Sequence, residues 1–149
     1  MKHSRGGSTR STSVVNKSSP TLSLLRIAAH VSTAPLVAVA RHGGLCIRGG
    51  DCRLTFRITD TAISGDGMRP RRLTALERRQ LLRAIAALDW RTICAHPFKG
   101  TCPTASDGPE STYTFRGFAH PLASCRYDLR LVQAVRVTER LLATLRSRS

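Results

Sequence analysis

Five cysteines, Cys46, Cys52, Cys94, Cys102 and Cys125, are the residues of this chain best suited to chemistry. Cysteine sulfur can ligate zinc, attack an electrophile or pair as a disulfide. Structural zinc sites group their ligands in pairs about two to four residues apart. Here five residues separate even the two nearest cysteines, so the spacing disfavours zinc. It does not choose among the disulfide pairings that five cysteines allow.

Two other groups of polar residues have the types that catalysis uses. Cys94 could act as a nucleophile with His96 as its base, but a base two residues away in a loop need not face it, and no orienting acid is evident. Asp107 and Glu110 could form an acid–base pair or a calcium corner. However, "DGPE" is ordinary turn chemistry, with glycine and proline fixing the backbone. We therefore predict no catalytic residues, no metal and no cofactor.

Strands are predicted on both sides of a Gly-Gly turn. "PLVAVAR" is a short β-prone run that ends at Gly43 and Gly44. "CRLTFRITD" alternates, which places Leu54, Phe56 and Ile58 on one buried face of an antiparallel strand. The next segment, "SGDGMRPRR", is predicted to be turn and loop.

A helix is predicted after this loop, because Thr74 and Glu77 have the spacing of a capping box. The pattern predicts that the helix runs to about Trp90 and buries leucine and isoleucine at helical spacing. Those buried positions are Leu81, Ile85 and Leu88. The segment "CAHPFKGTCPTASDGPE" is predicted to be a loop.

The last part of the chain predicts two strands and a helix. "STYTFRG" and "LASCRYD" are strands joined by a turn from Gly117 to Pro121, and Asp128 caps the final helix. The apolar face of this helix is predicted to be Leu131, Val135, Leu142 and Leu145. The order predicts one small α+β domain over residues 34–149, an antiparallel sheet of about four to five strands with two helices packed on one face.

The N-terminal residues 1–33 contain no acid and are rich in Ser, Gly and Arg, which predicts a disordered leader. "TLSLLRIAAHVSTAPLVAVA" resembles a degenerate export signal, with Ala38-Val39-Ala40 in the small-x-small form of a cleavage site. Arg26 and His30 interrupt its apolar run. No run reaches the length of about 20 apolar residues that a membrane span needs.

The net charge is +15, carried by 21 arginines and three lysines against nine acids. Such a surplus predicts non-specific attraction to nucleic acid, anionic surfaces or acidic partners. The alternative is a GC-rich coding bias, which favours arginine codons over lysine codons.

Several segments together resemble an uncharacterised family of small exported bacterial proteins. They are "GGLCIRGGDCR", "DTAISGDG", "RRLTALERRQLLRAIAALDW", "PFKGTCPTASDGPESTYTF" and "ASCRYDL", within residues 35–145. The family has a Gly-Gly-x-Cys…Cys-Arg pair, a Gly-Thr-Cys-Pro-Thr-Ala-x-Asp-Gly-x-Glu block followed by Tyr-Thr-Phe, and a late Ser-Cys. The resemblance implies disulfides matching Cys46 with Cys52 and Cys102 with Cys125. It leaves Cys94 as a free thiol, which we expect to be reduced and buried.

Two functions fit these features. The first is a non-catalytic, disulfide-stapled binding module, secreted or in the cell envelope. Its order of elements and its Gly-Gly turn are similar to the layout of emfourin-type metalloprotease inhibitors. That similarity implies a protein partner, such as a protease, contacted through loops bearing Gly43, Gly44, Lys99, Asp107 and Glu110. For the glycines, the alternative is a turn that merely needs positive φ. The second function is a nucleic-acid-associated protein that uses the arginine surplus, although paired cysteines favour an oxidising compartment.

Overall fold

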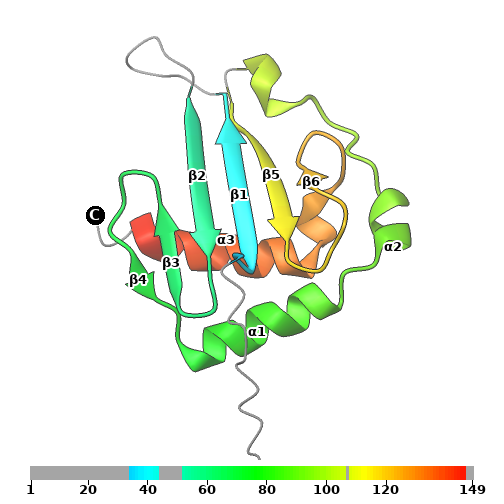
Figure 1. The fold of residues 1–149 in the computed structure, drawn as a ribbon. Coiled ribbons are helices and arrows are strands. Elements are labelled where there is room, and N and C mark those ends of the chain that lie inside the picture. The colour runs from blue at the N-terminus through cyan, green and yellow to red at the C-terminus, as the bar shows by residue number, and fades with distance from the viewer. Residues whose placement is uncertain (1–33, 44–51, 107, 147–149) are drawn as a thin grey trace, which may run out of the picture. The chain divides into compact units, whose positions relative to one another are not determined.

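The computed structural model describes residues 34–43, 52–106 and 108–146, all within one compact unit that spans Val31–Ser149. They form a six-stranded antiparallel sheet in the order β4-β3-β2-β1-β5-β6, with helices packed against it (Figure 1). The prediction of an α+β domain is confirmed, with more strands than expected. The predicted leader, residues 1–33, lies outside the described residues, and so do Gly44, Cys46 and Asp107.

The centre of the sheet is β1 (Val37–His42), which pairs with β2 (Arg53–Ile58) on one side and β5 (Glu110–Phe115) on the other. The register places Val39 between Phe56 and Tyr113. Because side chains alternate along a strand, these three residues share one face, and all three are buried. This face therefore forms the strand side of the core.

Two strands were missed: β3 (Ala62–Gly65), which extends into the segment expected to be turn and loop, and β4 (Arg71–Arg72), which lies at its end. Both are short, and the glycine and proline residues between them mask the alternation that would reveal a strand. At the other edge, β6 (Leu122–Ala123) pairs with β5, so the second predicted hairpin is present but its last strand is only two residues long.

Helix α1 (Ala75–Ala86) begins as predicted, because the Thr74 side chain accepts from the Glu77 backbone N–H and the Glu77 carboxylate accepts from the Thr74 N–H. The prediction that it continues to Trp90 is wrong. A second helix, α2 (Trp90–Cys94), starts there, and its N-terminal N–H groups donate to the side chain of Asp89. Leu81 is fully buried, while Ile85 and Leu88 are only partly buried.

The last helix, α3 (Gln133–Arg146), lies behind the sheet in Figure 1, with α1 packed against it. Asp128 does not cap it, because Asp128 instead caps a short 3-10 turn, η2 (Leu129–Leu131). This turn changes the helical phase, so Leu131 is 60% exposed and not buried as predicted. Leu129 and Val132 are buried in its place.

One strand residue also departs from the prediction. Leu54 is 41% exposed, although Phe56 and Ile58 on the same face are buried. β3 pairs only with residues Phe56 to Ile58 of β2. Leu54 therefore has no neighbouring strand on the outer side of β2.

The structure corrects the interpretation of Ala38-Val39-Ala40 as a cleavage site. These residues lie in the middle of β1 and pair with strands on both sides. Ala38 and Ala40 point away from the core and Val39 points into it, so the small-x-small pattern reflects the alternation of a strand. Cleavage after Ala40 would remove most of the central strand. Among the described residues, no helix has the length and apolar content that crossing a membrane requires.

Candidate functional site at the stapled end of the sheet

The end of the sheet where β1 finishes and β5 begins is closed by a disulfide between Cys102 and Cys125, whose Cα atoms are 5.2 Å apart. The predicted pairing of these two cysteines is confirmed. Cys125 directly follows Ser124, whose N–H donates to the Ser111 carbonyl. It therefore lies near Glu110, whereas Tyr113, further along β5, pairs with Leu122.

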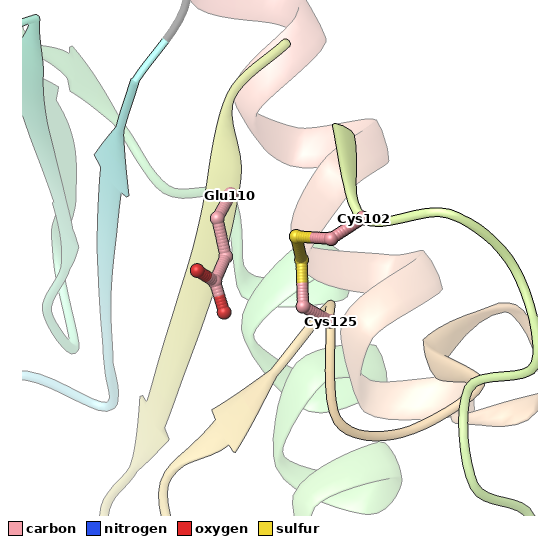
Figure 2. Close-up of side chains that lie close together, drawn as sticks. All are labelled: Cys102, Glu110 and Cys125. Carbon is pink, nitrogen blue, oxygen red and sulfur yellow. A yellow bond between two sulfur atoms is a disulfide. The ribbon is translucent and has the colours of Figure 1, made fainter. Parts of the chain in front are cut away.

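Glu110 lies beside this disulfide (Figure 2). One ligand atom from each of Cys102, Glu110 and Cys125 lies within 4.8 Å of the others, a spacing that a metal ion could bridge. The two sulfur atoms are bonded to each other, however, and a disulfide does not offer the thiolates that bind a metal. The Glu110 carboxylate is 3.2 Å from Nε2 of His42 on the neighbouring strand. In this state the cluster is a disulfide next to the Glu110–His42 contact.

Gly43, one of the predicted partner-binding residues, approaches the loop after α2 at this end. It follows β1 with a φ of +85°, and a Cβ atom added there would lie 3.2 Å from both the Gly108 carbonyl oxygen and the Thr104 Cγ2. Thr104 belongs to η1 (Pro103–Ser106), a short 3-10 turn that follows Cys102. Both the positive φ and this close approach favour glycine at position 43.

The loop is also held by its own backbone. The Gly108 N–H donates to the Pro103 carbonyl at 2.7 Å, and the Ala105 N–H donates to the Cys102 carbonyl at 2.9 Å. We call the surface formed by Gly43, Cys102, Thr104, Glu110 and Cys125 the stapled end.

The remaining predicted partner-binding residues are distributed as follows. Lys99 is exposed in the loop after α2, beside a cavity of about 600 Å³ that it helps to line. Glu110 was predicted to lie in a loop, but it is the first residue of β5. Cys52 is disulfide-bonded, and its predicted partner Cys46 lies outside the described residues.

Cys94 is free and exposed, so the expectation that it is buried is wrong. It lies at the end of α2, where Ile93 and not Cys94 faces the core. The nearby His96 donates from Nδ1 to the Thr92 carbonyl at 2.8 Å. No hydrogen bond joins Cys94 to His96 in the part of the chain that the structure describes.

A partly buried polar cluster that the sequence did not reveal lies on the helix side of the same end. Arg41 Nη2 donates to Glu139 Oε1 at 2.7 Å, and the Tyr113 hydroxyl donates to the same oxygen at 2.8 Å. Burial, followed by the charge of Glu139, raises the pKa of Tyr113 to about 12. The Arg41 guanidinium also lies over the Phe56 ring, 5.1 Å from its centroid. Since 98 residues separate Arg41 from Glu139, no local pattern could predict this contact.

The described acidic side chains are engaged inside the fold. Asp60, for example, accepts from both Arg78 and Arg116, and these hydrogen bonds lower its pKa. In contrast, the helix arginines Arg79, Arg83 and Arg91 are exposed and form no ion pair with a described acid. The charge surplus is therefore presented to solvent.

No protein-family model, curated protein or solved structure matches this chain.

Proposed function

We propose that this protein is a non-catalytic, exported binding module that contacts a partner protein through its stapled end. The observation that carries the proposal is the close approach of Gly43, which follows β1, to the loop after α2, at a site closed by the Cys102–Cys125 disulfide. A loop fixed in this way loses little conformational entropy when it binds, which favours affinity.

The disulfide also supports the exported part of the proposal. Disulfides persist in oxidising compartments and are rare in the cytosol. Cys52 is disulfide-bonded as well, which leaves Cys94 as the free thiol among the described cysteines. Three of the four described cysteines are thus disulfide-bonded, which favours a secreted or envelope location.

Binding is favoured over catalysis because the polar groups at the stapled end satisfy one another. Glu110 contacts His42, and the Cys102 and Cys125 sulfurs are joined in a covalent bond. Neither sulfur offers a thiolate for nucleophilic attack. The finer form of the proposal, an inhibitor of a secreted protease, rests on the similarity in layout to emfourin-type inhibitors.

Two measurements test this proposal. Alkylation of protein recovered from its native compartment, denatured without reductant, should label Cys94 and leave Cys102 and Cys125 unlabelled. A photo-crosslinking amino acid at Lys99, in the loop that leads to Cys102 of the stapled end, should then capture a partner in the native host, whereas the same amino acid at the exposed Arg79 on α1 should not. Labelling of Cys102 and Cys125, or equal capture from both positions, would contradict the proposal.

A second candidate function follows from the exposed helix arginines. Arg79, Arg83 and Arg91 could bind nucleic acid non-specifically through its phosphates. That function predicts affinity that falls steeply with salt, is insensitive to changes at the stapled end, and is lost when the three arginines are replaced by glutamine. Oligonucleotide binding measured at two salt concentrations separates the two candidates.

A further inference from the structure

A cleft with a volume of about 730 Å³ lies beside the Arg41–Glu139–Tyr113 cluster, between the sheet and α3. Arg41 and His42 are consecutive on β1, so their side chains point to opposite faces of the sheet. His42 contacts Glu110, next to the disulfide, while Arg41 lines the cleft. The cleft and the disulfide therefore occupy the two sides of one end of the sheet.

The walls of the cleft are strongly cationic. Four guanidinium groups line it, and Glu139 is the one acid among its described lining residues; the arginines are Arg41, Arg130, Arg136 and Arg140. Arg130 is neutralised by Asp128, and Arg41 by Glu139. Arg136 and Arg140 are exposed and form no ion pair with a described acid. They leave two positive charges available to a ligand.

The start of α3 adds to this positive potential. Gln133, Val135 and Arg136 belong to the first turn of the helix and line the cleft, and this turn contains no acid. A helix N-terminus carries partial positive charge, so a cation there is unfavourable and a nearby anion is favourable. The preceding residue, Val132, has no side-chain oxygen that could cap the helix. A bound anion would offset both effects.

The other lining residues indicate what the anion is attached to. Leu129, Val135 and the ring of Tyr113 form the floor of the cleft, and each is less than a tenth exposed. Nucleic-acid sites that stack bases use exposed aromatic rings, and the described lining of this cleft has none. The exposed groups are the guanidinium groups of Arg136 and Arg140, which are suited to carboxylates, and the narrow floor leaves room only for small aliphatic groups beside them.

We infer that this cleft binds an acidic, partly apolar peptide segment of the partner protein, with its carboxylates held by Arg136 and Arg140. The inference rests on the proposed function and extends it, because it names the chemistry of the partner.

The test uses purified, oxidised full-length protein and a fluorescein-labelled, end-capped peptide of alternating leucine and glutamate, followed by fluorescence polarisation. The Arg136→Gln/Arg140→Gln double variant should bind this peptide at least about tenfold more weakly than the wild type. It should stay folded, because it removes a cation from a helix N-terminus. The matched control is Arg79→Gln/Arg91→Gln, which lowers the net charge equally away from the cleft and should change affinity by less than about twofold.

Two further binding measurements test the inference. A peptide of leucine and glutamine should not bind, and a single-stranded oligonucleotide of equal charge should not compete. The inference is wrong if no peptide binds, if the control variant weakens binding as much as the cleft variant, or if the oligonucleotide displaces the peptide. Each of these leaves the thiol state and the crosslinking from Lys99 untouched, so the proposed function can fail or stand separately.

Discussion

The Phe56 ring lies directly over Gly65, its cross-strand partner in the β2–β3 pair. A Cβ atom added at Gly65 would be 2.6 Å from Phe56 Cδ1, well inside normal contact. Phe56 cannot easily move away, because it is 1% exposed and the Arg41 guanidinium lies over its ring. Because Gly65 has no side chain, the Phe56 ring can pack against it. The same ring lies beneath the guanidinium of Arg41.

Replacement of Gly65 by alanine should therefore destabilise the fold by about 1–3 kcal/mol, the range seen for overpacked cores. The measurement is the midpoint of urea unfolding followed by circular dichroism. Ser64→Ala, on the same strand but the opposite face, is the control and should be nearly neutral. Equal stability of the Gly65→Ala variant and the wild type would show that the Phe56 ring adjusts without cost.

The Cys102–Cys125 bond closes a loop with a sequence separation of 23 residues. In the chain-entropy model, such a loop contributes roughly 3 kcal/mol by restricting the unfolded chain. We expect the Cys102→Ser/Cys125→Ser variant to lose about this much stability in urea unfolding, while Cys94→Ser, at an exposed free thiol, should unfold like the wild type. A double variant that unfolds at the wild-type midpoint would contradict the role of the staple.

Glu77 couples stability to acid. Its carboxylate accepts from Arg71 and from Thr74, and the Arg71 hydrogen bond is the largest cause that lowers its pKa from 4.5 to about 2. A lowered carboxyl pKa contributes stability above the unfolded-state value, and that stability is lost as pH falls through the folded-state value. The contribution at neutral pH is roughly 3 kcal/mol at most.

Glu77→Gln should accordingly be less stable than the wild type at pH 7, by roughly 1–3 kcal/mol. The difference should shrink as the pH falls from 4.5 to about 2. Urea unfolding of both proteins at several pH values measures this. A difference that stays constant with pH would mean that Glu77 acts through its size or its cap alone and not through its charge.

Tyr113 should titrate unusually high. With Tyr127 replaced by phenylalanine to remove the other tyrosine, the ultraviolet signal of tyrosinate should reach its midpoint near pH 12 and not near 10.0. Because the folded state holds this proton more tightly, stability should fall as pH rises between these two values. Adding Glu139→Gln should lower the midpoint, because it removes the negative charge that opposes ionisation. A midpoint unaffected by that change would leave burial as the sole cause.

The parts of the fold that the sequence predicted are those with strong local patterns. The Thr74–Glu77 capping box and the alternation around Phe56 depend on residues a few positions apart. The errors occurred where a local signal had two structural uses. Asp89 and Asp128 are both good caps, but one starts a short second helix and the other a 3-10 turn.

The candidate site was predictable only in part. The Cys102–Cys125 pairing followed from a resemblance and not from spacing. The approach of Gly43 to Thr104, and the contact of Arg41 with Glu139, depend on which strands neighbour β1. Strand order depends on how much apolar surface the whole sheet buries. The residues adjacent in sequence to Gly43, Thr104, Arg41 or Glu139 therefore do not show which strands will be neighbours.

The central position of β1 affects how this protein can fold during synthesis. Its two neighbours are β2, which follows closely in the chain, and β5, which begins only at Glu110. Until β5 has emerged from the ribosome, one edge of β1 has no strand to accept its hydrogen bonds, and an open edge of this kind favours association with other chains. The three central strands of the sheet therefore cannot all pair until β5 has been made.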